Sequence, residues 1–125
     1  EKQAALEDAY TEGSPEFDEY SKLIIVSTDP QRLIESTTGL GDIIMQIGGT
    51  IHNRGDKTVS GLEISVGMVD SKGDLIKDKK VLVIPKEYPE LKPKETVDIS
   101  VNVPGFEADD DRANARWKVT AIKLK

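Results

Sequence analysis

The stretch LEISVGMVDSKGDLIKDKKVLVI, residues 62–84, decides the fold class. In residues 62–68 apolar side chains alternate with polar or small ones, which is the two-residue period of a strand with one buried face. Residues 70–74 follow as a polar, glycine-containing run that is typical of a hairpin loop. Residues 75–84 return as the partner strand, and the charges at 77–80 are typical of an exposed sheet edge. The stretch predicts an antiparallel hairpin.

The rest of the chain from residue 22 onward repeats this pattern of short strands and turns. Residues 97–103 show a second clean alternation, and Gly48-Gly49 predicts a bulge or a close approach of two backbones. Asp29-Pro30 predicts a turn or a helix start, and Leu33-Ile34 fit either a continued edge strand or one helical turn. Further strands are predicted from apolar runs at residues 23–26, 43–53 and 117–121, the last of which changes phase at Ile122 and Leu124.

The number and spacing of these strands select the architecture. A parallel sheet needs crossover helices, and none can be placed after Ser36. We therefore predict an all-β fold, an antiparallel β-sandwich of about seven strands of the immunoglobulin or fibronectin type III kind. At 125 residues the chain suits one such domain.

The amino-acid composition argues against several kinds of metal and catalytic site. Cysteine is absent and His52 is the only histidine, so thiolate sites, the usual zinc ligand sets and histidine-activated nucleophiles lack their residues. We expect a protein that is not an enzyme and needs no cofactor. No stretch reaches the roughly 20 apolar residues that span a bilayer.

The net charge of −6 is unevenly distributed. Residues 1–20 hold seven of the 23 acidic residues and one of the 17 basic ones, so the remaining chain carries sixteen of each. Nucleic-acid binding needs a basic face that displaces counterions from phosphates, and we expect none here.

The acidic segment suggests a division into an N-terminal extension or linker, residues 1–21, and a sandwich domain, residues 22–125. Residues 6–10 have helical spacing, and Ser14-Pro15 offers the cap and first position of another short helix. Short helices are marginal alone in water, so a solvated leader or linker is the favoured interpretation. A helix that docks on the sandwich is the alternative.

Three short patterns resemble those of a known family. Residues 49–53 (GTIHN) are similar to a G-x-hydrophobic-x-N motif that ends in a turn. Residues 66–70 end in Asp before a hairpin that contains Gly73, although Val66, Met68 and Val69 stand where Phe, Leu and Tyr are expected. Residues 91–95 (LKPKE) are similar to L-x-P-G-E, with Lys94 in the glycine position. In this order the patterns resemble the FxLYD family, immunoglobulin-like sandwiches of bacterial and archaeal envelope proteins.

The resemblance covers residues 43–124, and its motifs mark turns and core positions rather than chemistry. It implies a module tethered outside the cytoplasmic membrane by an upstream helix or lipid anchor. From it we expect a non-catalytic, extracytoplasmic interaction or structural module of the cell envelope, the soluble part of a membrane-anchored protein. Its expected partner is another envelope protein or a second copy, and membrane attachment would come only through a segment absent from this chain.

A loop of carboxylates offers an alternative function. Glu107, Asp109, Asp110 and Asp111 lie within one loop, and calcium takes oxygen ligands from such loops. Glu107, Asp109 and Asp111 are the candidate ligands. The alternating D-x-D-x-D-G spacing is absent and Arg112 adjoins the run, so a solvated loop is favoured over a calcium- or ligand-binding accessory site. Residues 54–56 (RGD) match an adhesion tripeptide at a predicted hairpin tip, but an ordinary turn explains them.

Overall fold

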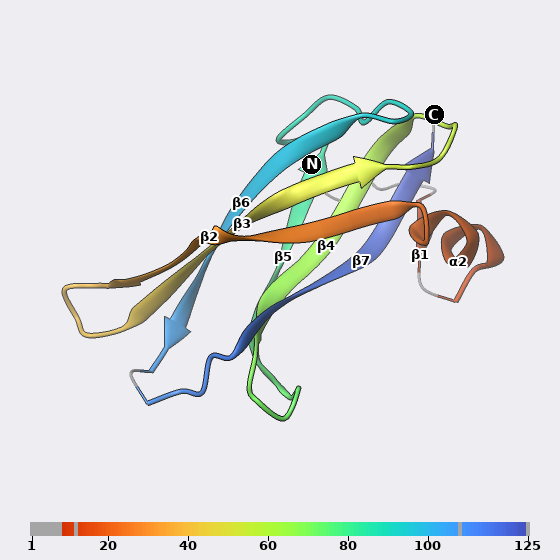
Figure 1. Cartoon of the computed structure of the whole chain (residues 1–125). Coiled ribbons are helices and arrows are strands. Elements are labelled where there is room, and N and C mark those ends of the chain that lie inside the picture. The colour runs from red at the N-terminus through yellow and green to blue at the C-terminus, as the bar shows by residue number, and fades with distance from the viewer. Residues whose placement is uncertain (1–8, 12, 108, 125) are drawn as a thin grey trace.

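Two antiparallel sheets pack face to face in the computed structural model, which describes residues 9–11, 13–107 and 109–124 (Figure 1). The elements in chain order are β1 (Tyr10–Thr11), α2 (Pro15–Ser21), β2 (Ile24–Thr37), β3 (Ile43–Asn53), β4 (Val59–Val69), β5 (Leu75–Ile84), β6 (Thr96–Phe106) and β7 (Asn114–Leu124). One sheet has the order β1-β7-β4-β5 and the other β2-β3-β6. The predicted all-β sandwich is confirmed.

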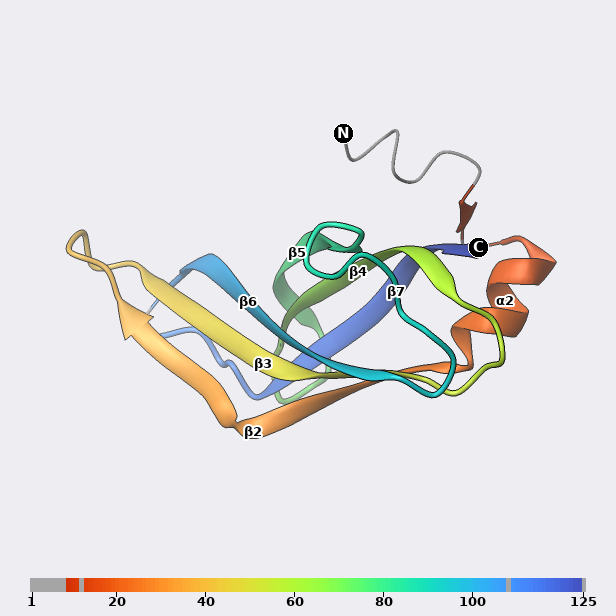
Figure 2. The same ribbon diagram turned by 90° about the horizontal axis from the view of Figure 1, so that it is seen from above.

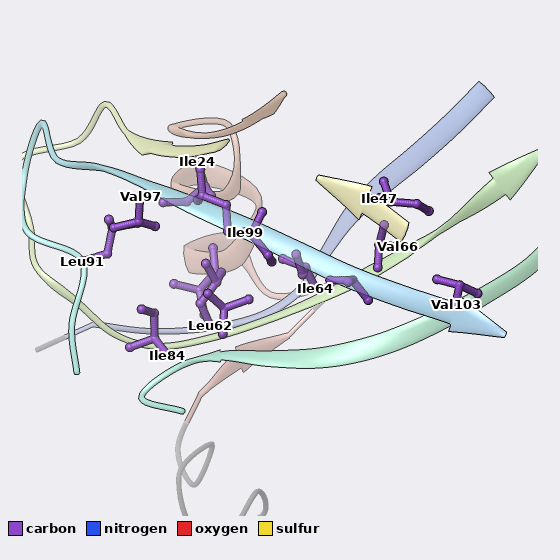
Figure 3. Close-up of a cluster of buried hydrophobic side chains, with 14 of the residues drawn as sticks. Ile24, Ile47, Leu62, Ile64, Val66, Ile84, Leu91, Val97, Ile99 and Val103 are labelled. Atoms are coloured by element: carbon purple, nitrogen blue, oxygen red, sulfur yellow. The ribbon is translucent and has the colours of Figure 1, made fainter. Parts of the chain in front are cut away.

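The core lies between the sheets and is built from the predicted alternations. Leu62, Ile64 and Val66 of β4 are fully buried, and Figure 3 shows them facing side chains from the other sheet, such as Ile47 and Ile99. Burying one such side chain contributes roughly 1.5–3 kcal/mol. The strand that decides the fold class is thus the central strand of the core.

β2 extends from Ile24 to Thr37, so Leu33 and Ile34 continue an edge strand, and Asp29-Pro30 begins an irregularity within the strand instead of a helix. Its pairing with β3 is interrupted between Thr28 and Leu33, opposite Gly48 and Gly49. A Cβ atom on Gly49 would lie 2.2 Å from the Ser27 carbonyl oxygen, so only glycine permits this approach of the two backbones. The close approach predicted for the glycine pair is confirmed.

The phase change predicted in the last strand is also confirmed. Val119 pairs with Ile64 and Ala121 pairs with Glu63, so Thr120 is an extra residue in β7. This bulge turns Ile122, which is fully buried, toward the same core as Val119.

Pro15–Ser21 form a docked helix, α2, rather than a solvated leader. The Ser14 hydroxyl accepts a hydrogen bond from the Phe17 amide at 3.2 Å, and proline occupies the first turn of α2. Phe17 and Tyr20 are 6% and 5% exposed and belong to the core, so a domain boundary at residue 22 cuts through it. The helix predicted over residues 6–10 falls mostly outside the described residues, and Tyr10 lies in β1.

A buried amide joins the helix to the connections between strands. Asn53 has no exposed surface. Its Nδ2 lies 2.8 Å from the Lys57 carbonyl oxygen and 3.2 Å from that of Leu91. Its Oδ1 accepts from the Gly55 amide at 2.9 Å and lies 2.8 Å from the Tyr20 hydroxyl oxygen. One side chain therefore ties together α2, the β3–β4 connection and the β5–β6 connection.

Lys94 has a backbone conformation that side chains disfavour. Its φ of +66° lies in the left-handed region, where a Cβ atom costs roughly 1–2 kcal/mol. The Lys94 amide donates to the Asn53 carbonyl oxygen at 2.8 Å, which holds the turn closed in this conformation.

We predict that Asn53→Leu lowers the free energy of unfolding by about 3 kcal/mol or more, because several buried backbone groups lose their partner. Tyr20→Phe removes one hydroxyl and should cost about 1 kcal/mol. Asn102→Leu, at an exposed position of β6, is the control and should stay within about 0.5 kcal/mol of wild type. Urea denaturation measures all three, and an equal cost at positions 53 and 102 would contradict the role of Asn53.

We predict that Lys94→Gly raises the free energy of unfolding by about 0.5–1 kcal/mol, since glycine adopts positive φ without strain. The matched control is Lys92→Gly, an exposed neighbour with ordinary φ, where the added backbone freedom should destabilise by a similar amount. Thermal unfolding of both variants measures the difference, and a destabilised Lys94→Gly protein would refute the strain.

Candidate functional site

The acidic loop is the first candidate for a functional site, and the structure changes which of its carboxylates lie together. The carboxylates of Glu107, Asp109 and Asp110 approach within 4.8 Å of one another. Asp111 does not join them, because its Oδ2 accepts from the Ser71 amide at 3.0 Å and the Ser71 hydroxyl at 2.7 Å. These hydrogen bonds, the hydroxyl first, lower the pKa of Asp111 below its usual value. Asp111 thus connects the β6–β7 loop to the β4–β5 hairpin.

The acidic loop also contains a cationic side chain, the guanidinium of Arg112. Arg112 Nη2 lies 2.5 Å from Glu35 Oε1 on β2, and Nη1 donates to the Glu107 carbonyl oxygen. The Asp110 carboxylate accepts from the Glu107 amide at 2.7 Å. The loop is therefore held by its own hydrogen bonds, and a cation would meet a carboxylate that already has a donor.

His52 and the RGD sequence at residues 54–56 are the other candidates for a functional role, and both have contacts within the fold that explain them. His52 Nδ1 lies 2.6 Å from Thr96 Oγ1 on the neighbouring strand, which is a cross-strand contact. The RGD sequence is not the tip of a hairpin, because β3 and β4 belong to different sheets. Gly55 is buried, and a Cβ atom there would lie 2.3 Å from the Tyr20 hydroxyl. The turn at residues 54–56 packs on α2 instead of projecting as a free loop.

The long edge of β7 is the second candidate. β4 pairs with one side of β7 along its length, whereas on the other side β1 pairs only with Ile122 and Ala121 (Figure 1). Residues 114–120 therefore have no neighbouring strand on that side within the described part of the chain. Unpaired strand edges are templates for an added strand.

A groove of about 470 Å³ runs beside this edge. Its walls come from α2, β2 and β7, and most of its lining is apolar, including Ile25, Val26, Trp117 and Val119. The Trp117 indole N–H donates to Thr28 Oγ1 at 2.6 Å and so fixes the ring between the two sheets. The groove offers apolar surface next to an unpaired backbone.

The two faces of β7 differ in character. Trp117 and Val119 pair with the buried residues Val66 and Ile64, so their side chains point toward the core. Arg116 and Lys118 alternate with them, are exposed, and lie on the outer face. An added strand would meet apolar side chains on one face and cationic ones on the other.

The other strand edges are protected against pairing. On β5, Lys77 and Lys79 pair with Met68 and Val66 and therefore point inward from an edge. Their Nζ atoms lie 3.4 Å from the carbonyl oxygens of Gly105 and Asn102, which covers the edge of β6 as well. Lys79 and Asn102 also line a groove of about 540 Å³ between β5 and β6.

The edge of β2 is interrupted, since the irregular residues 29–32 include Pro30, which has no amide hydrogen to donate. Residues 114–119 of β7 contain neither proline nor an inward-pointing charge. Sequence reasoning predicted the strand but missed this property, because the order of strands in a sheet is not visible in the local pattern.

Comparison with protein-family models finds no match, and comparison with curated proteins finds none either. None of the helices among the described residues is long and apolar enough to cross a membrane.

Proposed function

We propose that this chain is a non-catalytic interaction module that binds a partner protein by strand addition at the β7 edge. The observation that supports the proposal is that the edge strands of the two sheets differ in how well they are protected against pairing. Among the residues that the structure describes, three edges are covered by lysines or interrupted, while residues 114–119 of β7 have no neighbouring strand on one side and lie beside an apolar groove. An open strand edge of this kind favours aggregation unless a partner occupies it. Binding of a partner strand therefore explains why this edge is left unprotected.

The module belongs, in this proposal, to an extracytoplasmic part of the cell envelope. The FxLYD resemblance is the support, and its motif positions have physical roles here. Asn53, at the end of the first motif, is the buried amide described above. Asp70 Oδ1 accepts from the amides of Lys72 and Asp74, both at 2.9 Å, and shapes the hairpin. Lys94 stands in the family's glycine position with positive φ.

The arrangement of the two ends fits a module that projects from an anchor. α2 and the C-terminal end of β7 lie at one end of the sandwich, and the β2–β3 hairpin lies at the other (Figure 2). A membrane or lipid anchor upstream of Glu1, in a segment that is not part of this chain, would hold the first end near the membrane. The groove beside β7 would then face sideways, where another envelope protein can reach it.

The alternative function is a calcium-binding accessory domain. The three carboxylates of Glu107, Asp109 and Asp110 within 4.8 Å favour it, because oxygen ligands from one loop suit calcium. Strand addition remains the leading proposal, since the loop is already held by its own hydrogen bonds.

We predict that Val119→Lys abolishes partner capture and leaves the sandwich folded. The substitution places an inward-pointing charge on the open edge, as Lys79 does on β5. Val81→Lys is a matched control, because Val81 and Val119 pair with the same residue, Ile64, from opposite sides and both are half-buried. The measurement is crosslinking and pull-down of the full-length protein from its native cells, with fractionation and mass spectrometry.

Capture by wild type and Val81→Lys, with loss in Val119→Lys, supports the proposal. Equal capture by both variants, with unchanged circular dichroism, would refute strand addition at β7. Recovery of the protein in the soluble cytosolic fraction would refute the envelope assignment.

The calcium alternative predicts that millimolar calcium, the range of weak extracellular sites, raises the melting temperature of wild type. The rise should persist in Asp111→Asn, whose carboxylate binds Ser71, and vanish in Asp109→Asn/Asp110→Asn. No rise in wild type would remove this alternative. An equal rise in all three proteins would indicate nonspecific ion binding.

A further inference from the structure

We propose that the groove between β5 and β6 binds a small, free amphipathic anion, a molecule with an apolar body and one carboxylate or phosphate. β5 and β6 are the edge strands on one side of the sandwich, whereas β7 and β2 form the other side. The site is therefore separate from the strand-addition site and does not rest on it. Its volume of about 540 Å³ is in the size range of small-molecule sites.

The walls of the groove include apolar side chains from both sheets. Leu82 of β5 is half-buried, and Pro85, which follows β5 directly, is exposed. Val101 of β6 pairs with the fully buried Ile47, so its side chain points between the sheets. A hydrocarbon or aromatic body in the groove would remove this surface from water, which favours binding.

Hydrogen bonds to β6 hold the walls of the groove in place. Lys79 Nζ lies 3.4 Å from the Asn102 carbonyl oxygen and so joins β5 to β6. In the β5–β6 connection, the Tyr88 hydroxyl donates to the Asp98 carbonyl oxygen at 2.7 Å. The groove is thus formed before a ligand enters, and preorganisation of this kind lowers the cost of binding.

The charged side chains that line the groove are mainly cationic. Lys79, Lys80 and Lys86 line it together with one carboxylate, that of Glu87. Within the described part of the chain, no hydrogen bond or ion pair engages the ammonium group of Lys80 or Lys86, and both side chains are exposed. The contact of Lys79 is with a neutral carbonyl group, which leaves its charge uncompensated. A site with this excess of cations favours an anionic head group.

The nearby acidic side chains leave the cationic excess in place. Glu87 adjoins Lys86 in the chain and compensates at most one of the three lysines. Asp78, two residues before Lys80, does not line the groove, and its carboxylate accepts from the Ser65 hydroxyl at 2.7 Å.

A peptide that adds as a strand is a poor occupant of this side of the sandwich. Lys77 and Lys79 point inward from the β5 edge and contact carbonyl oxygens of β6, so both strand edges are covered. The groove therefore suits a molecule without a peptide backbone.

Octanoate tests the proposal on the whole chain, with octanol and octyltrimethylammonium as neutral and cationic probes of the same chain length. We expect octanoate to shift the amide NMR signals of residues 79–82 and 100–102 and to bind about tenfold more tightly than octanol at low salt. Octyltrimethylammonium should bind more weakly than octanol. Acetate, which has the carboxylate without the long apolar body, should bind more weakly than octanoate.

Two double variants separate the groove from general surface charge. Lys80→Gln/Lys86→Gln should weaken octanoate binding about tenfold, to the level of octanol. Lys72→Gln/Lys92→Gln is the matched control, because it removes two exposed lysines that lie outside the groove, and it should bind octanoate as wild type does. Val119→Lys, on the other side of the sandwich, should also bind as wild type does.

Four outcomes would overturn the proposal. They are no octanoate-dependent shift in residues 79–82 and 100–102, equal affinity for octanoate and octanol, acetate binding as tight as octanoate binding, and equal loss in the two double variants. Capture by anionic lipid vesicles that depends on Lys80 and Lys86, without octanoate binding, would make a membrane surface the occupant and also overturn it. Each of these results leaves strand addition at β7 to its own test, the Val119-dependent capture from cells.

Discussion

The buried amide of Asn53 is the constraint on which one end of the sandwich depends. A fully buried amide without partners is costly, so its acceptors and donors must stay in place. Those partners belong to segments far apart in the chain: Tyr20 on α2, the turn after β3, and Leu91 after β5. The Leu91 amide and carbonyl in turn pair with Val59, where β4 begins. One polar side chain therefore sets the relative positions of the helix, two connections and the start of the central strand.

Asn53 closes one end of the sandwich, so the strand edges along its sides determine what can bind. A two-layer sandwich has four edges, and each unpaired edge is a risk of aggregation. On one side, inward-pointing Lys77 and Lys79 reach across to β6 and cover both edges together. On the other side, within the described part of the chain, β1 pairs only with the end of β7, and the Trp117 indole bonds to Thr28 of β2. The asymmetry comes from a few side chains and not from the architecture, which is why a common fold can present a specific surface.

The loops at the opposite end are held by charge and hydrogen bonding. Asp111 binds Ser71 of the neighbouring hairpin, and Arg112 binds Glu35 of β2. The Arg112 side chain is 10% exposed and that of Glu35 is 52% exposed, so water screens this ion pair only in part. Together the two contacts fix where the acidic loop lies. The same contacts remove Asp111 from the carboxylate cluster and leave Asp110 in its place. A candidate ligand set is thus decided by contacts to other loops.

The sequence by itself determined which elements form and which residues face the core. Alternation in residues 62–68 and 97–103, the phase change at Ile122, the Ser14-Pro15 cap and the glycine pair in β3 are local signals, and each corresponds to a feature of the structure. Only the tertiary structure decided that α2 docks, that β7 has an open edge, that the RGD turn packs on Tyr20, and that Asp110 replaces Asp111 among the clustered carboxylates. The physical reason is the separation along the chain of the residues that interact. Periodicity and capping depend on neighbours in the chain, whereas pairs such as Tyr20 with Asn53 or Ser71 with Asp111 form between residues that no local pattern relates.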